Sequence, residues 1–215
     1  MEQHTVNKDK NTGGISPKLH LGLNITVRSS SCFFSMLSAG FSVTAKAGCS
    51  IDVFLGQNYG ITEAYIDDRI QTIFLNGKAV DDSRTAILQE GATLALSAAM
   101  PGMVGSTLRK GGVFAGMRSQ ISHVTDTPAD GDRQIRIKLK LFNLIAKELG
   151  SAFLQKGVYL EGNTFHDFLQ RNSKALQTVC LAISLNDAKT DVAELLEINW
   201  KNNEIFLQVT PEQKS

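Results

Sequence analysis

The sequence has few cysteines and prolines, a single tryptophan and no long apolar run. Its 215 residues include 3 cysteines and 4 prolines. Cys32, Cys49 and Cys180 are odd in number, far apart and without a C-x-x-C pair, which disfavours a disulfide framework or a zinc site. We interpret them as reduced thiols that fill the core, and we therefore expect a cytoplasmic protein.

Neither sign of charge dominates, because 22 basic residues face 21 acidic ones and the net charge is +1. Such a balance gives no bulk attraction to nucleic acid or to an anionic membrane. The apolar stretch 32–41 is interrupted by serines and a glycine and is much shorter than the roughly 20 residues that span a bilayer. We expect no nucleic-acid partner and no membrane span, and the 42% hydrophobic content fits two modest cores.

Recognisable catalytic and metal-binding patterns are also missing. The serine run 29–31 lacks the G-x-S-x-G context of an exposed nucleophile, and we expect a loop there. Segment 102–110 combines glycines with two cations, but no lysine follows Gly105 as the phosphate-loop pattern requires. The polar residues of 123–132 lie among turn formers and fit a linker better than a metal site. We expect no metal and no cofactor, and a binding protein more readily than an enzyme.

The sequence does contain an internal repeat. SIDVFL at 50–55 recurs in type as TFHDFL at 164–169. Other features recur at a similar shift: 112 residues from Ile25 to Ile137 (137 − 25), 110 from Asn76 to Asn186 (186 − 76) and 111 from Leu94 to Ile205 (205 − 94). The near-constant shift indicates that one architecture is encoded twice.

Each copy predicts a small mixed sheet with a helix across one face. In the first copy, alternation and turn signals predict strands at 21–27, 41–45, 72–75 and 93–98, a helix capped by Ser50, a helical turn at 62–69 and a tight turn at Asn76-Gly77. In the second copy, they predict strands at 135–139, 158–160, 179–185 and 205–209, and helices at 141–153 and after Thr164.

Three stretches also resemble a known family. IRIKLKLFNLIAKELG at 135–150 resembles an opening strand followed by LFA-x-LRELAG, IFLNGKAV at 73–80 resembles V-A-V-N-G-x-x-V, and EGATLAL at 90–96 resembles D-G-D-E-V-A-L. These motifs are similar to those of the β-grasp sulfur carriers of molybdopterin and thiamine biosynthesis, a ubiquitin-like family. The resemblance implies an α+β fold with two β-grasp domains in tandem. The expected division is a disordered tail at 1–17, domain 1 at 18–104, a helix and linker at 105–132, domain 2 at 133–211 and a tail at 212–215.

The chain departs from that family where the family's chemistry takes place. The carriers end in a flexible Gly-Gly whose carboxylate is adenylated and converted to a thiocarboxylate. The first copy runs on past 98–103 and the second ends TPEQKS, without glycine. Gly111-Gly112 would serve as such a tail only if a protease cut after it, and glycine pairs are common in loops.

The sequence therefore predicts a non-catalytic tandem β-grasp module that binds other proteins. The resemblance suggests a cofactor-biosynthesis enzyme or metalloenzyme as partner, in molybdenum or tungsten cofactor synthesis or in sulfur transfer. The expected partner-binding residues are Met100, Pro101, Gly102, Met103, Arg109, Lys110 and Trp200. Two alternatives stay open: a derived or processed sulfur carrier with its tail at Gly111 and Gly112, and a binder of small ligands or anions that uses the 102–110 loop or the interdomain cleft.

Overall fold

The computed structural model describes residues 19–26, 30–98, 105, 108–110 and 133–212. The strands are β1 (Leu19–Ile25), β2 (Phe41–Lys46), β3 (Thr72–Leu75), β4 (Lys78–Ala79), β5 (Thr93–Ser97), β6 (Gln134–Phe142), β7 (Val158–Glu161), β8 (Cys180–Leu185), β9 (Ala188–Thr190) and β10 (Glu204–Pro211). The helices are η1 (Ser30–Phe33), α1 (Phe34–Ala39), α2 (Ile51–Tyr59), α3 (Glu63–Asp68), α5 (Asn143–Lys156), α6 (Gly162–Val179) and α7 (Val192–Glu197).

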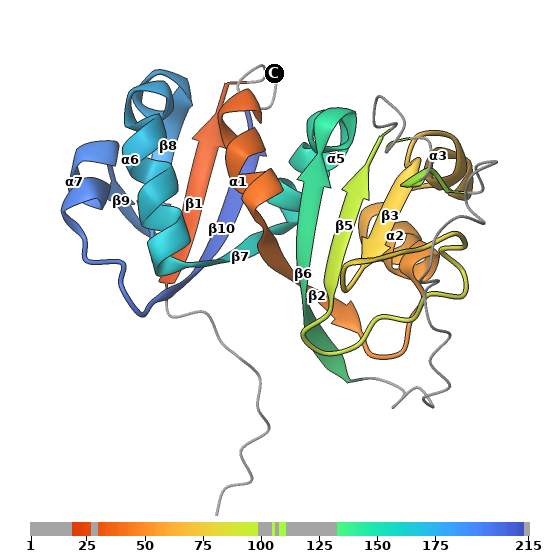
Figure 1. The fold of residues 1–215 in the computed structure, drawn as a ribbon. Helices are drawn as coiled ribbons and strands as arrows, with labels where there is room; N and C mark the ends of the chain where they lie inside the picture. The colour runs from red at the N-terminus through yellow and green to blue at the C-terminus, as the bar shows by residue number, and fades with distance from the viewer. Residues whose placement is uncertain (1–18, 27–29, 99–104, 106–107, 111–132, 213–215) are drawn as a thin grey trace, which may run out of the picture.

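The chain is α+β, as expected, and its strands form a mixed ten-stranded sheet in the order β4-β3-β5-β6-β2-β7-β10-β1-β8-β9 (Figure 1). We call β4, β3, β5, β6 and β2 the first set, and β7, β10, β1, β8 and β9 the second set. Each set has a parallel pair at its centre, β5 with β6 and β10 with β1, and antiparallel strands on both sides. In the strand pairing, the two sets meet at a single residue pair, Ser42 of β2 with Tyr159 of β7.

The first strand of each copy lies in the set formed by the rest of the other copy. β1 pairs with β10 and β8, whereas β6 pairs with β2 and β5. The first set is therefore contiguous over 41–142, and the second set combines 19–25 with 158–211. The strand pairing crosses the expected boundaries of 18–104 and 133–211, although whether those ranges fold as separate units stays a prediction.

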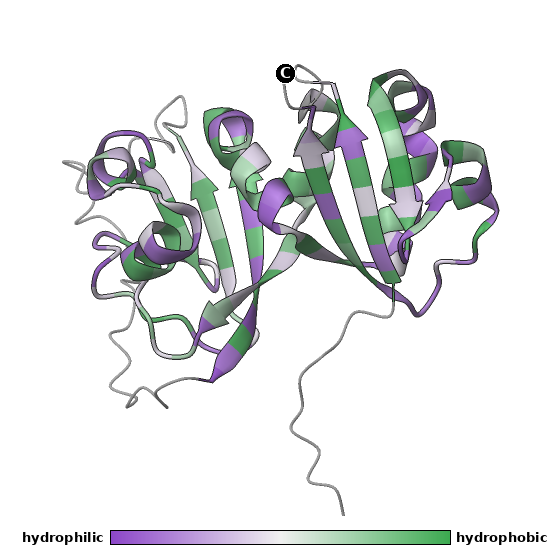
Figure 2. Cartoon of the chain, turned by 180° about the vertical axis from the view of Figure 1, so that it is seen from behind, coloured by the Kyte–Doolittle hydropathy of each residue, from purple (hydrophilic) through white to green (hydrophobic). Residues whose placement is uncertain are grey.

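Buried and accessible residues alternate along the strands, which shows that one face of each set is buried. Helices cover that buried face. In β6, for example, Ile135, Ile137 and Leu139 are buried, and Figure 2 shows the corresponding bands of hydropathy along the strands. In Figure 1, α6 lies in front of its half of the sheet, whereas α2 and α3 lie in front of theirs in the reverse view of Figure 2. Sheet twist of roughly 20–25° per strand accounts for this reversal over ten strands.

The buried apolar residues of both sets form one connected cluster rather than the two cores that we expected. At the boundary between the sets, Phe153 of α5 packs against Phe41 of β2 with ring centroids 5.7 Å apart. In the second set, Phe168 of α6 stacks on Phe33 at 5.4 Å. Helix α5 also reaches the second set, since a side chain at Gly157, its C-cap, would collide with Phe206 of β10.

Local signals account for several element ends. Asn76-Gly77 forms the predicted turn, and Asn186-Asp187 forms a turn at the corresponding place in the second half of the chain; all four residues have positive φ. Thr62 caps α3 by accepting a hydrogen bond from the Tyr65 N–H at 3.2 Å. Ser50 is the N-cap residue of α2, but its hydroxyl donates to the Asp52 carboxylate instead of accepting a backbone N–H.

Candidate functional site

Trp200 belongs to the core, which corrects its prediction as a partner contact. Its side chain is 1% exposed. The indole N–H donates to the Leu195 carbonyl at 2.9 Å, and the ring meets Phe165 edge-on at 4.8 Å. The side chain therefore offers no surface to another protein and serves to pack α6 against the segment after α7.

The other predicted partner residues fall within segment 100–110 of the sequence. Lys110 is held by α3, because its ammonium donates to the Ile66 carbonyl at 2.9 Å and pairs with Asp67 at 3.2 Å. Arg109 is exposed. Met100, Pro101, Gly102 and Met103 lie outside the described residues, as do Gly111 and Gly112, so their predicted roles stay predictions.

The accessible face of the first set carries two lysines above small residues, and we call this surface the basic face. Its members are Lys138 and Lys140 of β6, Thr93 and Ala95 beside them on β5, and Ser42 opposite Lys138 on β2. The alkyl stems of both lysines lie close to Gly40. The face ends at Thr72 and Ser97, which are buried. Lys138 is exposed, and Lys140 is half-buried.

The charges of the basic face are not neutralised by neighbouring strands. No acidic residue stands beside Lys138 or Lys140 in the register of β2 or β5. Within the described part of the chain, neither lysine forms an ion pair or a side-chain hydrogen bond. These two cations therefore remain available to an external anion.

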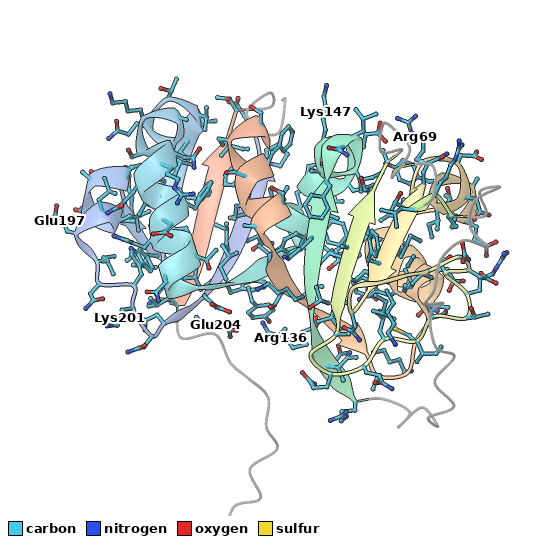
Figure 3. All side chains as sticks on the ribbon, viewed as in Figure 1. Arg69, Arg136, Lys147, Glu197, Lys201 and Glu204 are labelled. Carbon is cyan, nitrogen blue, oxygen red and sulfur yellow. The ribbon has the colours of Figure 1, made fainter. Side chains whose placement is uncertain are left out.

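Arg136 lies two residues before Lys138 on the same face of β6, and its side chain makes contacts within the protein. Its guanidinium lies over the Tyr159 ring at 3.2 Å and pairs with Glu204 at 3.4 Å (Figure 3). Only 14% of the Arg136 side chain is exposed. Because Arg136 belongs to the first set and its two partners to the second, this cluster fastens the sets together beside their single shared residue pair.

A cavity of about 290 Å³ opens where the two sets diverge, and we call it the junction pocket. Its lining consists of Thr44 from β2, Gln57, Asn58 and Tyr59 from the end of α2, Lys156 and Gly157 from the end of α5, and Tyr159 and Phe206 from β7 and β10. The pocket thus combines three aromatic rings with amide and hydroxyl groups. Its lining combines residues from both ranges that the sequence predicted as domains, and a ligand-binding cleft between two domains stays a prediction.

The junction pocket has one formal charge in its lining. The Lys156 ammonium lies 5.6 Å from the centroid of the Tyr59 ring, and no carboxylate lines the pocket. Burial raises the pKa of the Tyr59 phenol, so this hydroxyl stays neutral at physiological pH. The electrostatic character of the lining is therefore positive.

Two further cavities lie around the outer strands of the second set. One, of about 300 Å³, lies over Gly22, Ser184 and Gln208 on the accessible sheet face, and another, of about 250 Å³, lies between the end of α6 and the start of α7. Their linings mix small, polar and apolar groups around Lys189, which both share. The first lining holds Ser184, Asp187 and Lys189, and the second holds Cys180, Lys189 and Asp191. Within the described residues, no ion pair joins the lysine to either carboxylate.

The described residues contain no metal-binding group of side chains, and the pKa values of their thiols are raised. No group of three or more histidine, cysteine, aspartate or glutamate side chains within them is placed to hold a metal ion. Burial raises the pKa of the Cys32, Cys49 and Cys180 thiols, that of Cys180 to about 11, which disfavours the nucleophilic thiolate. Over the same residues, no helix has the length and apolar character needed to cross a membrane.

Comparison with protein-family models, with curated proteins and with solved structures finds no match to this chain.

Proposed function

We propose that the protein is a non-catalytic module that binds an acidic surface of a partner protein through the basic face. The observation that carries this proposal is that, within the described residues, Lys138 and Lys140 form no ion pair on the accessible face of the first set. Charge complementarity of this kind speeds association and selects partners.

The finer fold assignment belongs to the same proposal. Two β-grasp units built with exchanged first strands would account for the repeat, for the similar five-stranded sets and for the helix packed on one face of each. The resemblance to sulfur carriers supports a partner among enzymes of molybdenum or tungsten cofactor synthesis or of sulfur transfer. In this proposal the exposed sheet face, and not a reactive end group, provides the function.

Affinity capture from cells that naturally make the protein tests the proposal. The wild type should retain a stoichiometric partner that elutes as salt is raised, since exposed charges are screened within about 10 Å at 0.1 M salt. The double variant Lys138→Gln/Lys140→Gln should lose this partner. The matched variant Lys147→Gln/Lys174→Gln removes the same charge from exposed helix positions on α5 and α6 and should retain it.

Two results would contradict the proposal. One is the absence of any stoichiometric partner, and the other is a partner that the Lys138→Gln/Lys140→Gln variant retains at wild-type affinity. Intact mass of the captured protein should match the full chain, whereas a species ending at Gly112 would favour the processed sulfur carrier instead.

A further inference from the structure

We propose that the junction pocket binds a small planar anion, meaning one or two fused aromatic rings that carry a carboxylate or a phosphate. This inference is independent of the protein-binding function, because the pocket and the basic face share no residue.

The volume of the pocket sets the size of the ligand. About 290 Å³ lies at the lower end of the range for small-molecule sites and suits a ligand of one or two rings. The pocket lies beside the Ser42–Tyr159 pair, where β2 and β7 meet, and it is partly open to solvent. The preference for a flat ligand comes from the aromatic side chains of its lining.

Aromatic side chains on the walls favour a ring. Tyr159 and Phe206 lie against each other with centroids 4.8 Å apart, and Tyr59 faces the pocket from α2. The Arg136 guanidinium lies over one face of the Tyr159 ring and restricts its movement, and the same tyrosine side chain lines the pocket. Rings held in this way offer a stacking surface without further loss of side-chain freedom.

The charge of the lining favours an anion. Lys156 is the one charged residue of the lining, and within the described residues it forms no ion pair. The neighbouring acid, Glu204, is already paired with Arg136. The Gln57 and Asn58 amides and the Thr44 hydroxyl add hydrogen-bonding groups to the same lining, and the Asn58 amide also donates to the Thr44 carbonyl at 3.3 Å. An acidic group on the ring would therefore meet Lys156, while the ring meets the aromatic walls.

The three tyrosines of the chain provide a direct readout. Two of them, Tyr59 and Tyr159, line the pocket, and Tyr65 lies on α3 with its hydroxyl on Glu148. Full-length protein labelled with 3-fluorotyrosine gives fluorine signals that single tyrosine-to-phenylalanine variants assign. Titration with 2-naphthoate or with adenosine monophosphate should shift the Tyr59 and Tyr159 signals and leave Tyr65 unmoved. Comparison of the affinities for the two probes shows whether the pocket prefers an aromatic carboxylate or a nucleotide.

The neutral analogues 2-naphthamide and adenosine test the requirement for charge. We expect them to bind about tenfold more weakly than the anions, as loss of one charge-assisted hydrogen bond predicts. Lys156→Gln should reduce the affinity for the anions by a similar factor and leave that for the neutral rings unchanged. Lys147 lies on the same helix, does not line the pocket and points outward from the molecule in Figure 3, so Lys147→Gln should bind both as the wild type does.

Several outcomes would overturn the proposal. These are unmoved Tyr59 and Tyr159 signals with every probe at millimolar concentration, an equal shift of Tyr65, or neutral and anionic rings that bind equally well. Preserved anion affinity in a folded Lys156→Gln variant would exclude the role of that lysine. Because no change is made to the basic face, each of these results leaves the protein-binding proposal standing.

Discussion

Glycine at position 162 is required by a close approach of two backbone segments. A β-carbon there would lie 1.8 Å from the Trp200 carbonyl oxygen, and the Gly162 N–H donates to the Asn203 carbonyl at 2.8 Å. Gly56, in the middle of α2, has a different environment, since the nearest atom to a β-carbon would be the Ile61 carbonyl oxygen at 3.6 Å. The same substitution at these two positions should therefore have opposite effects.

Gly162→Ala should lower the free energy of unfolding by about 1–3 kcal/mol, because the backbone around Trp200 has to move to admit the methyl group. Gly56→Ala should raise it by about 0.5–1 kcal/mol, since alanine is the better helix former. Denaturant unfolding of both variants and of the wild type measures the two differences. A stabilised Gly162→Ala variant would show that the contact with Trp200 is looser than described.

The Cys180 thiol should react slowly with alkylating reagents. Burial raises its pKa to about 11, with a smaller contribution from nearby Cys32. At pH 8 its thiolate fraction is then roughly two orders of magnitude below that of a free cysteine, and the alkylation rate should fall accordingly. Peptide-resolved mass spectrometry after a timed iodoacetamide pulse measures this rate. Alkylation of Cys180 in the folded protein at the rate measured for glutathione would contradict this prediction.

At the element scale, α3 and α5 are clamped together at the surface. Glu148 of α5 accepts a hydrogen bond from the Tyr65 hydroxyl at 2.5 Å and pairs with Arg69, the C-cap residue of α3. The Arg69 hydrogen bond, followed by that of Tyr65, holds the pKa of the Glu148 carboxyl below its ordinary value of about 4.5. Figure 3 places Arg69 at this edge of the molecule, close to the helix that carries Lys147.

The clamp should contribute to stability only while Glu148 is ionised. A lowered folded-state pKa means that the contribution is complete above about pH 4.5 and is lost as the pH falls through the folded pKa. The stability difference between wild type and Glu148→Gln should therefore be positive at pH 7 and shrink towards zero in acid. Unfolding curves of both proteins from pH 7 to pH 3 measure it. A difference that does not change with pH would show that the clamp acts through packing and not through charge.

Local sequence signals predicted many elements but not their partners. The alternation at 21–25 and 135–139 and the Asn76-Gly77 turn depend on a few adjacent residues, so the sequence predicted these two strands and this turn. η1 and α1 were missed because the serines of 29–31 and Ser35 favour loops in isolation, and the extent of α6 was not predicted. The junction pocket could not be predicted, since its lining comes from five elements that are far apart in the sequence.

At the scale of the whole molecule, the exchange of first strands can be tested by cross-linking. Asn24 of β1 lies opposite Ala182 of β8 in an antiparallel pair, and both are exposed. Paired strand positions bring α-carbons to the 4.5–5.5 Å that a disulfide spans. In a chain whose native cysteines are replaced by serine, Asn24→Cys/Ala182→Cys should therefore oxidise readily. Mass spectrometry under non-reducing conditions measures the yield.

The repeat itself supplies the control for that experiment. The shift of 112 residues makes Arg136 the counterpart of Asn24, and Arg136 lies opposite Thr44. If each copy kept its own first strand, Asn24 would lie opposite Thr44 instead. Asn24→Cys/Thr44→Cys should remain reduced under the same conditions, and a high disulfide yield for this pair would refute the exchange.

The exchange also determines how the molecule should unfold. Two independent domains would lose structure at different denaturant concentrations, whereas here one buried cluster runs through both sets and α5 packs against each. Both connections that cross between the sets, through η1 and α1 and through α5, are themselves part of this cluster. We therefore expect a single cooperative transition.

Two probes that report on different parts of the chain make this expectation measurable. Trp200 is the only tryptophan and lies in the second set, so its fluorescence follows that set, whereas far-ultraviolet circular dichroism follows the helices and strands of both. The two signals should give the same midpoint and the same slope against urea concentration, because a shared core has to open as a whole. A tryptophan transition clearly separated from the circular dichroism transition would mean that the sets unfold independently, and that the residues linking them contribute little to the stability of either.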